Sequence, residues 1–253
     1  MRRLLIIGIG AGDPDYITIQ AVKALNAVDV FFMVEKGEQK ASMVDLRRDL
    51  IERHVEHRAY RVVEIRDPER DRTAGPYGAA VEAWRHQRAD AYEAAIRDHL
   101  GADECGAILV WGDPSLYDST LGIVEEIVAR GALALEYAVV PGISSVQALA
   151  ARHRTNLNRI GESIQITTGR RLAQGWPPDV DNVVVMLDAQ NTYQHMEADD
   201  LDIFWGAYIG TPDELLIAGR LTEVAVEIER VRAEARARHG WIMDTYLLRR
   251  RLP

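Results

Sequence analysis

Strand-like and helix-like patterns alternate through the first part of the chain. Short apolar runs, typical of buried strands, are separated by longer segments whose apolar residues recur every three or four positions, as on one face of a helix. The predicted strands are residues 2–9, 30–34, 61–65 and 107–111. The predicted helices between them are residues 19–28, 43–55 and 78–100. This order predicts a mostly parallel sheet with helices on its faces.

The pattern changes after residue 116, where strands follow one another with less helix between them. The predicted strands of this part are residues 133–140, 163–168, 182–187, 202–210 and 241–248. The predicted helices are residues 120–130, a short helix that begins at Ser144, and the charged stretch 226–238. We therefore predict two domains, an N-terminal α/β domain over residues 1–116 and a C-terminal α+β domain with a mixed sheet over residues 117–253.

Two Gly-Asp-Pro sequences follow predicted buried strands. The first corner, residues 8–16, reads GIGAGDPDY, and the second corner, residues 111–118, reads WGDPSLYD. Glycine lets the backbone approach a ligand closely, and proline stiffens the turn. Ligands of α/β sheets bind beyond the carboxyl ends of the strands. We therefore expect the two corners to face one ligand cleft.

Several familiar sites are excluded by spacing. The glycines of the first corner are spaced G-x-G-x-G, whereas a dinucleotide fingerprint requires G-x-G-x-x-G that leads into a helix. Asp13 and Asp15 follow, and their carboxylates would repel a pyrophosphate. No G-K-[ST] follows to make a phosphate-binding P-loop, and no G-x-S-x-G elbow indicates a serine hydrolase.

Composition indicates an ordinary globular protein without disulfides or metal. The 253 residues are 47% hydrophobic and 27% charged, and Cys105 is the single cysteine. A disulfide framework is therefore excluded, and no metal site is expected, since His195 in its acidic loop is interpreted as solvated. No apolar run reaches the roughly 20 residues of a membrane span. The apolar run that opens the chain ends in glycines instead of a cleavage site, so a cytoplasmic enzyme is expected.

The net charge disfavours a nucleic-acid partner, and the distribution of arginines leaves two interpretations of one stretch open. The net charge is −9 at pH 7, so nonspecific binding to nucleic acid is not expected. Residues 47–72 are rich in arginine, and this stretch is either a solvated helix face and loop or a rim that pairs with an acidic ligand. The arginines that could pair with an acidic ligand, inside this stretch or elsewhere, are Arg47, Arg48, Arg72, Arg85, Arg88, Arg170 and Arg171.

Four motifs in order resemble the tetrapyrrole methylases, which use S-adenosylmethionine to methylate intermediates of the cobalamin and sirohaem routes. They are LLIIGIGAGDPDYITIQAVKALNAVDVFF, LVWGDPSLYDST, VVPGISSVQALAA and IGTPDELLIAGRL, and they extend from residue 4 to residue 221. The resemblance implies two α/β domains with a cleft between them, a homodimer, a small-molecule precorrin substrate, and no nucleic-acid or membrane partner. The opening motif, the form of the second corner and the insertion at residues 67–96 resemble those members that methylate carbon 1 of the macrocycle and release acetate.

The same resemblance implies where the methyl donor binds. Its predicted contacts are Trp111, Gly112, Asp113, Leu116, Ser144, Ser145, Leu187, Phe204, Trp205, Gly206 and Thr211. Family members often have methionine at the position aligned with Leu187, and Met186 stands one residue earlier, so a shift of one residue stays open. Ser144 is also interpretable as a plain helix N-cap.

Catalytic candidates come from the residues expected on the precorrin side of the cleft and at one strand end. A general base would activate the water that adds to the acetyl carbonyl, and Asp13 and Asp188 are the candidates for it. Tyr16 and Tyr117 are possible proton donors. The alternative readings are a loop or capping carboxylate for Asp13 and a solvated turn residue for Asp188.

Other functions stay open on the same motifs. The fold also serves enzymes that methylate another position of the ring, and relatives that act on a protein or a ribosomal RNA. A ligand-binding relative without catalytic activity is a further alternative, which turnover would distinguish from mere binding of the cofactor.

Overall fold

The computed structural model describes residues 1–35, 41–56, 59–68, 77–197 and 199–251. The chain divides into two compact units. The first unit comprises Met1–Gly10 and Pro14–Ile143, and the second comprises Ala11–Asp13 and Ser144–Pro253. No helix in the described part of the chain is both long and apolar enough to cross a membrane.

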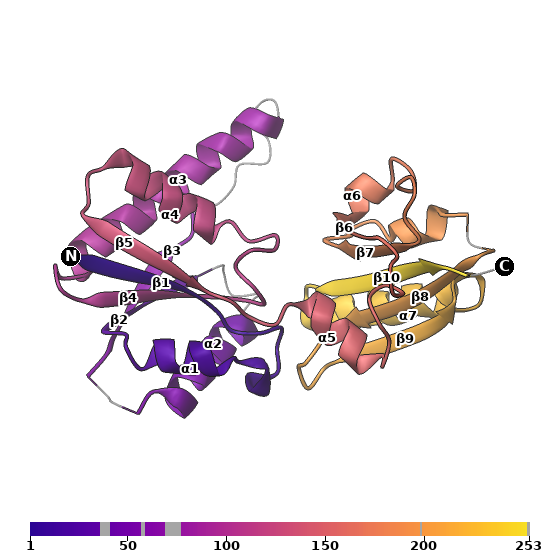
Figure 1. The fold of residues 1–253 in the computed structure, drawn as a ribbon, viewed down its shortest axis with the longest axis horizontal. Coiled ribbons are helices and arrows are strands. Elements are labelled where there is room, and N and C mark those ends of the chain that lie inside the picture. Colours follow the sequence, from indigo (N-terminus) through magenta and orange to yellow (C-terminus); the bar gives the residue numbers. More distant parts are fainter. Residues whose placement is uncertain (36–40, 57–58, 69–76, 198, 252–253) are drawn as a thin grey trace. The chain divides into compact units, whose positions relative to one another are not determined.

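The first unit contains a five-stranded sheet in the order β3-β2-β4-β1-β5, and every neighbouring pair is parallel, as the strand pattern predicts (Figure 1). The strands are β1 (Arg2–Gly8), β2 (Val30–Glu35), β3 (Arg61–Arg66), β4 (Cys105–Val110) and β5 (Leu135–Val140). Their carboxyl ends share one edge of the sheet, because parallel strands run in the same direction. That edge carries both glycine corners.

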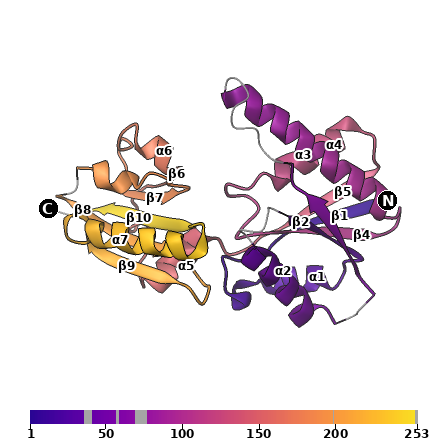
Figure 2. The same cartoon turned by 180° about the vertical axis from the view of Figure 1, so that it is seen from behind.

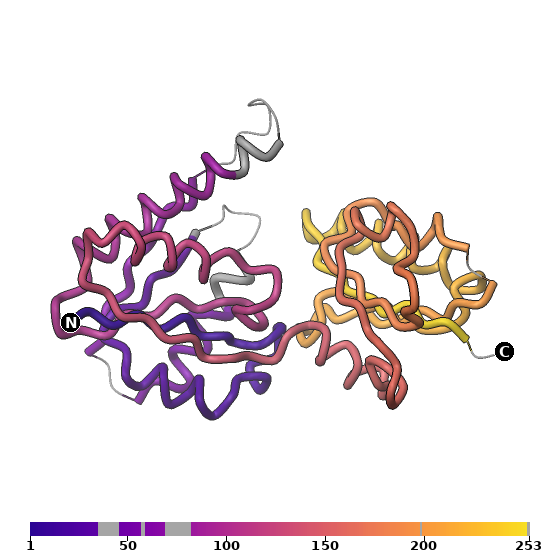
Figure 3. Tube along the Cα trace, turned by 45° about the horizontal axis from the view of Figure 1, so that its top comes forward, coloured from indigo at the N-terminus to yellow at the C-terminus, as the bar shows by residue number. Residues whose placement is uncertain are grey.

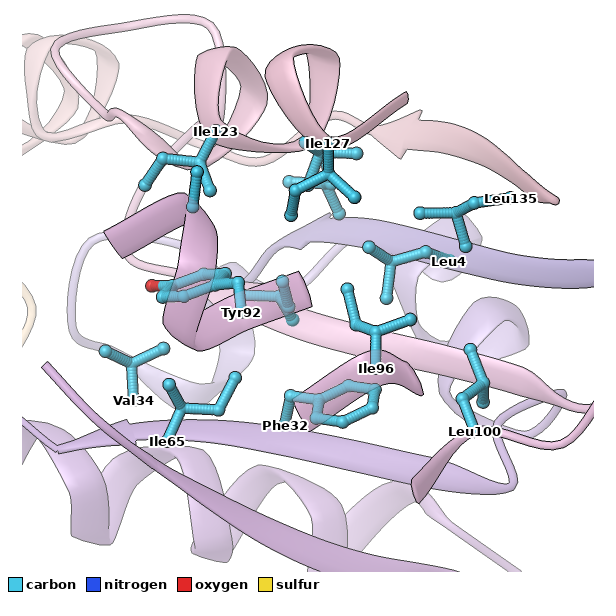
Figure 4. Packing of buried hydrophobic residues seen from close by; sticks show 14 of the residues in the cluster. Leu4, Phe32, Val34, Ile65, Tyr92, Ile96, Leu100, Ile123, Ile127 and Leu135 are labelled. Carbon is cyan, nitrogen blue, oxygen red and sulfur yellow. The ribbon is translucent and has the colours of Figure 1, made fainter. Parts of the chain in front are cut away.

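Helices cover both faces of this sheet (Figure 1). One face packs against α1 (Ile19–Leu25) and α2 (Ala41–His54), and the other against α3 (Tyr77–His99) and α4 (Thr120–Arg130). Side chains of β1 alternate between the two cores, as the period of a strand requires. Figure 4 shows the second of these cores, in which Tyr92 and Ile96 of α3 gather with Phe32 and with Ile123 and Ile127 of α4.

The boundary predicted between residues 116 and 117 differs from the structure. The strand β5 pairs with β1 in the first sheet, with Leu5 opposite Ala138, so α4 and β5 complete the first unit. Figure 3 shows the indigo β1 tube running beside the β5 tube, although they lie far apart in sequence. The change of pattern after residue 116 therefore did not mark a domain boundary. Hydrophobic periodicity is a local signal, and it does not show that β5 pairs with a strand more than a hundred residues earlier. The units change between Ile143 and Ser144.

The second unit contains a mixed sheet in the order β6-β7-β10-β8-β9, as predicted. Only the β6–β7 pair is parallel among its strand pairs in the described residues. The strands are β6 (Ile164–Thr168), β7 (Asn182–Met186), β8 (Leu201–Ala207), β9 (Leu215–Arg220) and β10 (Asp244–Arg250). The helical segments are α5 (Ser145–Arg152), α6 (Gly169–Leu172), the 3-10 turn η3 (Thr192–His195) and α7 (Leu221–His239). The strand β9 was not predicted, and α7 begins before the charged stretch at residue 226.

Each face of the second sheet has a different helix against it. Figure 2 shows α7 lying across the sheet, where it packs on β8 and β9. The core on this face contains Trp205 and Tyr246, both fully buried. A buried ion pair joins α7 to β10, with Arg232 Nε 2.8 Å from Asp244 Oδ2. The helix α5 covers the opposite face, where a Cβ added at Gly206 would lie 3.0 Å from Leu149.

The N-cap of α1 offers a modest stability test. Thr18 Oγ1 accepts a hydrogen bond from the Ala21 amide at 3.0 Å and so caps α1. Thr18→Ala is expected to lower the free energy of unfolding by about 1 kcal/mol, since it leaves that amide without its partner. Urea unfolding measures the loss, and Thr18→Ser, which keeps the hydroxyl, is the control. Equal losses in the two variants would contradict the capping role.

Candidate functional site

The two glycine corners lie side by side at the carboxyl edge of the first sheet. Gly10 and Gly112 form an isolated antiparallel bridge. The Gly112 amide donates to the Gly10 carbonyl at 2.8 Å, and the Gly10 amide donates to the Gly112 carbonyl at 3.3 Å. The repeated glycine corner therefore has a structural reason, since each corner supplies the backbone partner of the other.

A third glycine joins them from the end of β5. A Cβ added at Gly142 would lie 2.1 Å from the Gly112 carbonyl oxygen, and one added at Gly8 would lie 2.6 Å from the Gly142 nitrogen. Both distances are too short for any side chain. The ends of β1, β4 and β5 thus meet backbone to backbone, which only glycine permits.

Asp113 holds the second corner against the segment that follows β5. Its Oδ2 accepts from the Gly142 amide at 2.8 Å, and its Oδ1 accepts from the Ser115 amide at 2.8 Å and from the Ser115 hydroxyl. Burial acts to raise the pKa of Asp113, but these hydrogen bonds from Ser115 and Gly142 outweigh burial and lower the pKa below its ordinary value. Most of this carboxylate is therefore used within the chain, as a structural anchor for the predicted cofactor corner.

The lowered pKa of Asp113 predicts a pH dependence of stability. A carboxyl group whose folded-state pKa is depressed contributes stability that is fully present above its ordinary pKa of 3.8 and is lost as the pH falls through the lower folded-state pKa. We expect the wild-type protein to exceed Asp113→Asn in free energy of unfolding at neutral pH, with a gap that narrows below about pH 4. Denaturant unfolding across the acid range measures the gap. A gap that stays constant to pH 3 would contradict this assignment.

Other residues of the second corner carry signs of a binding surface. Tyr117 has φ +52° and is 47% exposed. A bulky residue in the left-handed region costs free energy, and such strain gathers at functional sites. Trp111 and Leu116 are half-buried, and the indole nitrogen of Trp111 is a buried donor with no partner among the described residues.

The first corner contains Asp13 and Tyr16, both half-buried. Gly12, with φ +144°, contacts the turn after β8 within the second unit, where its added Cβ would lie 2.5 Å from the Ile209 carbonyl oxygen and 2.8 Å from Thr211 Cγ2. The structure thus brings the segment of the predicted base Asp13 next to the predicted cofactor residue Thr211.

The serine pair has structural partners on the sheet face that α5 covers. Ser144 caps α5 by accepting from the Val146 amide at 3.2 Å, as the N-cap interpretation predicts. The Ser145 hydroxyl lies 3.2 Å from the Thr245 hydroxyl on β10. Thr245 is paired with Gly206 on β8, so Ser145 and Gly206 belong to one neighbourhood. The contribution of Thr245 was not predicted, since no local motif marks it.

Leu187 stands out directly after β7. It has φ +54°, and its side chain is 65% exposed. Met186 is half-buried and stays in the sheet, paired with Thr245 and Thr168. The exposed, left-handed position therefore belongs to Leu187, which favours the alignment without a shift.

The structure corrects the proposed base role of Asp188. Its carboxylate is 5% exposed and accepts four hydrogen bonds, from the Gln190 amide, from both the amide and the hydroxyl of Thr192, and from the Tyr246 hydroxyl. A carboxylate offers about four acceptor sites, so none is left to activate a water. Nor is Asp188 the solvated turn residue of the alternative reading.

The structure also limits two aromatic candidates on β8. Trp205 is fully buried, and its indole donates to Asp244 at 3.1 Å, so only its backbone could meet a ligand. Phe204 is half-buried, with its ring 5.7 Å from the His153 ring and 5.4 Å below the Arg249 guanidinium. Their periodicity indicated a strand correctly, but motif resemblance does not distinguish a side-chain contact from a backbone contact.

Two of the arginines expected to meet an acidic ligand are buried inside the first unit. Arg88 is 2% exposed and donates to Asp67 at 2.6 Å, to Tyr92 at 3.1 Å and to the Ser119 hydroxyl. Arg47 is 9% exposed and donates to the Leu109 carbonyl at 3.0 Å. Arg88 is therefore not available to an acidic ligand, and for Arg47 both interpretations of residues 47–72, the solvated face and the ligand rim, fail. The exposed candidates are Arg48, Arg85, Arg170 and Arg171, whereas Arg72 lies outside the described residues.

Sequence comparison gives one family and a relative of nearly the same length. The model of the Tetrapyrrole (Corrin/Porphyrin) Methylases matches residues 3–225. The chain is 48% identical over 250 residues to precorrin-6A synthase [deacetylating] from Sinorhizobium sp., covering 99% of this chain and 96% of the relative. It is 24% identical to a cobalt-precorrin-2 C(20)-methyltransferase of Methanocaldococcus jannaschii, over 88% of this chain and 90% of that protein.

Solved structures give the same fold. A cobalamin-synthesis-related protein (CobF) from Corynebacterium diphtheriae superposes with a TM-score of 0.86 at 36% identity, over 99% of both chains. A uroporphyrin-III C-methyltransferase from Thermus thermophilus, solved with S-adenosylhomocysteine, superposes with a TM-score of 0.58 at 18% identity, over 97% of this chain and 96% of that one. The latter likeness shows the fold alone.

Proposed function

Since the chain belongs to the tetrapyrrole (corrin/porphyrin) methylase family, we propose that it is an S-adenosylmethionine-dependent C-methyltransferase of cobalamin biosynthesis. The proposed reaction methylates carbon 1 of precorrin-5 and releases acetate to give precorrin-6A. The observation that carries this proposal is 48% identity over 99% of the chain to a precorrin-6A synthase that is named for deacetylation.

The residues present fit S-adenosylmethionine as the methyl donor. The half-buried Trp111 has an indole donor with no partner among the described residues, and Leu187 presents apolar surface and a strand-end backbone. In this proposal four parts of the chain hold the methyl donor. They are the second corner (Trp111, Gly112, Asp113 and Leu116), the serine pair (Ser144 and Ser145), the strand end at Leu187, and β8 with its following turn (the backbone of Phe204, Trp205 and Gly206, together with Thr211). When bound, S-adenosylmethionine supplies an electrophilic methyl group on its sulfonium.

The chain's share of the chemistry is to move protons and align the reacting carbon. Asp13 is the proposed general base, since Asp188 already accepts four hydrogen bonds. Tyr16, three residues after Asp13, is the proposed proton donor. Asp13 takes a proton from the water that adds to the acetyl carbonyl. The bond between carbon 1 and the acetyl carbon then breaks, acetate leaves, and carbon 1 keeps the electron pair. That pair would form the bond to the methyl group as the bond between the methyl group and the donor's sulfonium sulfur breaks. Holding these groups in line and excluding water provides most of the acceleration.

Charge complementarity to the substrate falls to the exposed arginines. Precorrins carry many carboxylates, and a protein of net charge −9 must offset them locally. Arg170 and Arg171 on α6 are the exposed candidates in the second unit, and Arg48 and Arg85 those in the first. Guanidinium groups suit this role because they bind carboxylates in a bidentate manner.

We propose a cytoplasmic homodimer with a small-molecule substrate and with no nucleic-acid or membrane partner. The support is the net charge of −9, the absence of a membrane-spanning helix in the described residues, and the resemblance of the motifs to a dimeric family. Sedimentation of the purified protein would test the dimer.

Mass spectrometry of a reaction with S-adenosylmethionine and precorrin-5, with acetate assayed in parallel, tests the proposed function. We expect the macrocycle to gain one methyl group and lose its acetyl group, with one acetate released for each methyl transferred. Methyl gain without acetate would move the reaction to another ring position. Binding of S-adenosylmethionine without any product would indicate either that the enzyme acts on a different substrate or that the protein binds the cofactor without catalysis.

A further inference from the structure

The turn from Leu187 to Thr192 is built around the buried carboxylate of Asp188. The Thr192 amide donates to Oδ2 at 2.6 Å, and the Gln190 amide donates to Oδ1 at 3.0 Å. The Thr192 hydroxyl also donates to Oδ1 at 3.0 Å. One side chain thus collects the local donors of the turn and fixes its path.

Two further elements hold Asp188 from outside the turn. Tyr246 on β10 donates its hydroxyl to Asp188 Oδ2 at 2.7 Å, and Arg232 on α7 donates to the Asp188 carbonyl at 2.7 Å. Arg232 is itself paired with Asp244. Gly169 provides the space, since a Cβ there would lie 2.4 Å from the Asp188 carboxyl carbon. The turn is therefore anchored to β10, α7 and the start of α6.

The anchored turn carries strain that an isolated chain would release. Leu187 has φ +54° and Asn191 has φ +55°. Asparagine tolerates the left-handed region, but leucine does so only when its surroundings enforce it. Burial of the Leu187 side chain does not enforce it, because that side chain is 65% exposed. The enforcing contacts are those of the next residue, Asp188.

We propose that Asp188, Tyr246 and Arg232 are positioning residues that hold Leu187 in its left-handed, exposed conformation and so pre-form one wall of the methyl-donor site. This inference rests on the proposed function, because it takes the backbone at Leu187 to meet the adenosyl end of the donor. None of the three side chains needs to touch the donor. Their effect reaches it through the backbone of the turn, so they act on donor affinity and not on the chemical step.

Tyr246→Phe tests the proposal, because it removes one hydrogen bond to Asp188 and keeps the ring. We expect the Kd for S-adenosylhomocysteine, measured by calorimetry, to rise about five- to tenfold, since apparent affinity falls with the fraction of molecules that hold the binding conformation. The rate constant kcat at saturating donor should stay within about twofold. Amide hydrogen exchange at Thr192, measured without ligand, should become faster.

Tyr193→Phe is the matched control. Tyr193 is as buried as Tyr246, and the two rings pack edge to face at 5.4 Å, but its hydroxyl has no hydrogen-bond partner among the described residues. This variant removes a buried hydroxyl from the same cluster without changing Asp188. Its Kd and its exchange at Thr192 should match the wild type.

A second substitution tests whether strain at Leu187 is the link. Glycine adopts the left-handed region without cost, so Leu187→Gly keeps the backbone contact and needs less enforcement. In the Leu187→Gly background, Tyr246→Phe should change the Kd by less than about twofold.

The possible results separate this inference from the proposed function. An unchanged Kd and unchanged Thr192 exchange in Tyr246→Phe would overturn the positioning role, as would equal effects of Tyr193→Phe. A folded wild type that binds no S-adenosylhomocysteine would overturn the proposed function. In that case the turn could no longer be assigned to the donor site. The hydrogen-exchange experiment would still show whether Tyr246 holds the turn.

Discussion

Asp13→Asn is expected to slow acetate release by about 100- to 10,000-fold, the usual contribution of a general base. Asparagine keeps the size of the side chain but cannot accept the proton of the attacking water. Methyl transfer should slow by the same factor, because carbon 1 becomes a nucleophile only after the acetyl group leaves. Acetate and methylated product are measured together in single-turnover reactions with precorrin-5.

Asp15→Asn is the control for this variant. Asp15 is an exposed carboxylate two residues after Asp13. Its substitution by asparagine changes the net charge by the same amount as Asp13→Asn. We expect it to keep nearly full activity, and both variants should bind S-adenosylhomocysteine like the wild type. Rates within tenfold of the wild type for Asp13→Asn would remove Asp13 as the base. A loss of donor binding would instead indicate that Asp13 shapes the first corner.

Gly142→Ala is expected to destabilise the first unit by about 3 kcal/mol or more, a large fraction of the stability of a typical domain. Its Cβ would lie 2.1 Å from the Gly112 carbonyl oxygen and 2.8 Å from the Gly8 carbonyl carbon. Both atoms belong to backbone and cannot rotate away, so the ends of β1, β4 and β5 would have to separate. Chemical denaturation measures the loss.

Gly122→Ala is the matched substitution in the same unit. Its added Cβ would meet only the end of the Arg85 side chain, at 3.0 Å, and Arg85 is exposed and flexible enough to move. Alanine also favours the helical conformation of α4, so stability should stay level or rise by up to about 1 kcal/mol. Similar losses for both variants would mean that the close approach of the three glycines does not limit stability.

The sequence predicts most of the first sheet because its signals are local. Apolar strands and periodic helices alternate, and parallel strands with helical crossovers follow from that order alone. The position of β5 was not predictable in this way. It pairs with β1, whose sequence lies more than a hundred residues earlier, and nothing within residues 135–140 identifies its neighbour.

In the candidate site, too, features with local signals were predictable and features that depend on long-range contacts were not. The meeting of the two glycine corners was predictable, because both follow parallel strands whose carboxyl ends share one edge of the sheet. The role of Asp188 was not, because its four donors come from Gln190, Thr192 and the distant Tyr246. Burial of Arg47 and Arg88 was equally hidden, since an arginine on a helix usually faces solvent and only tertiary contacts make its burial favourable.

The division of the first corner between the two units also bears on biosynthesis. Residues 11–13 pack with the second unit, on the turn at Ile209–Thr211, although the strand before them belongs to the first. A ribosome makes that turn roughly 200 residues later, about 10 to 40 s at ordinary elongation rates. The first sheet can assemble during this interval, whereas the segment of Asp13 waits for its partner. The segment of Asp13 therefore reaches its packed position only after the turn at Ile209–Thr211 has been made.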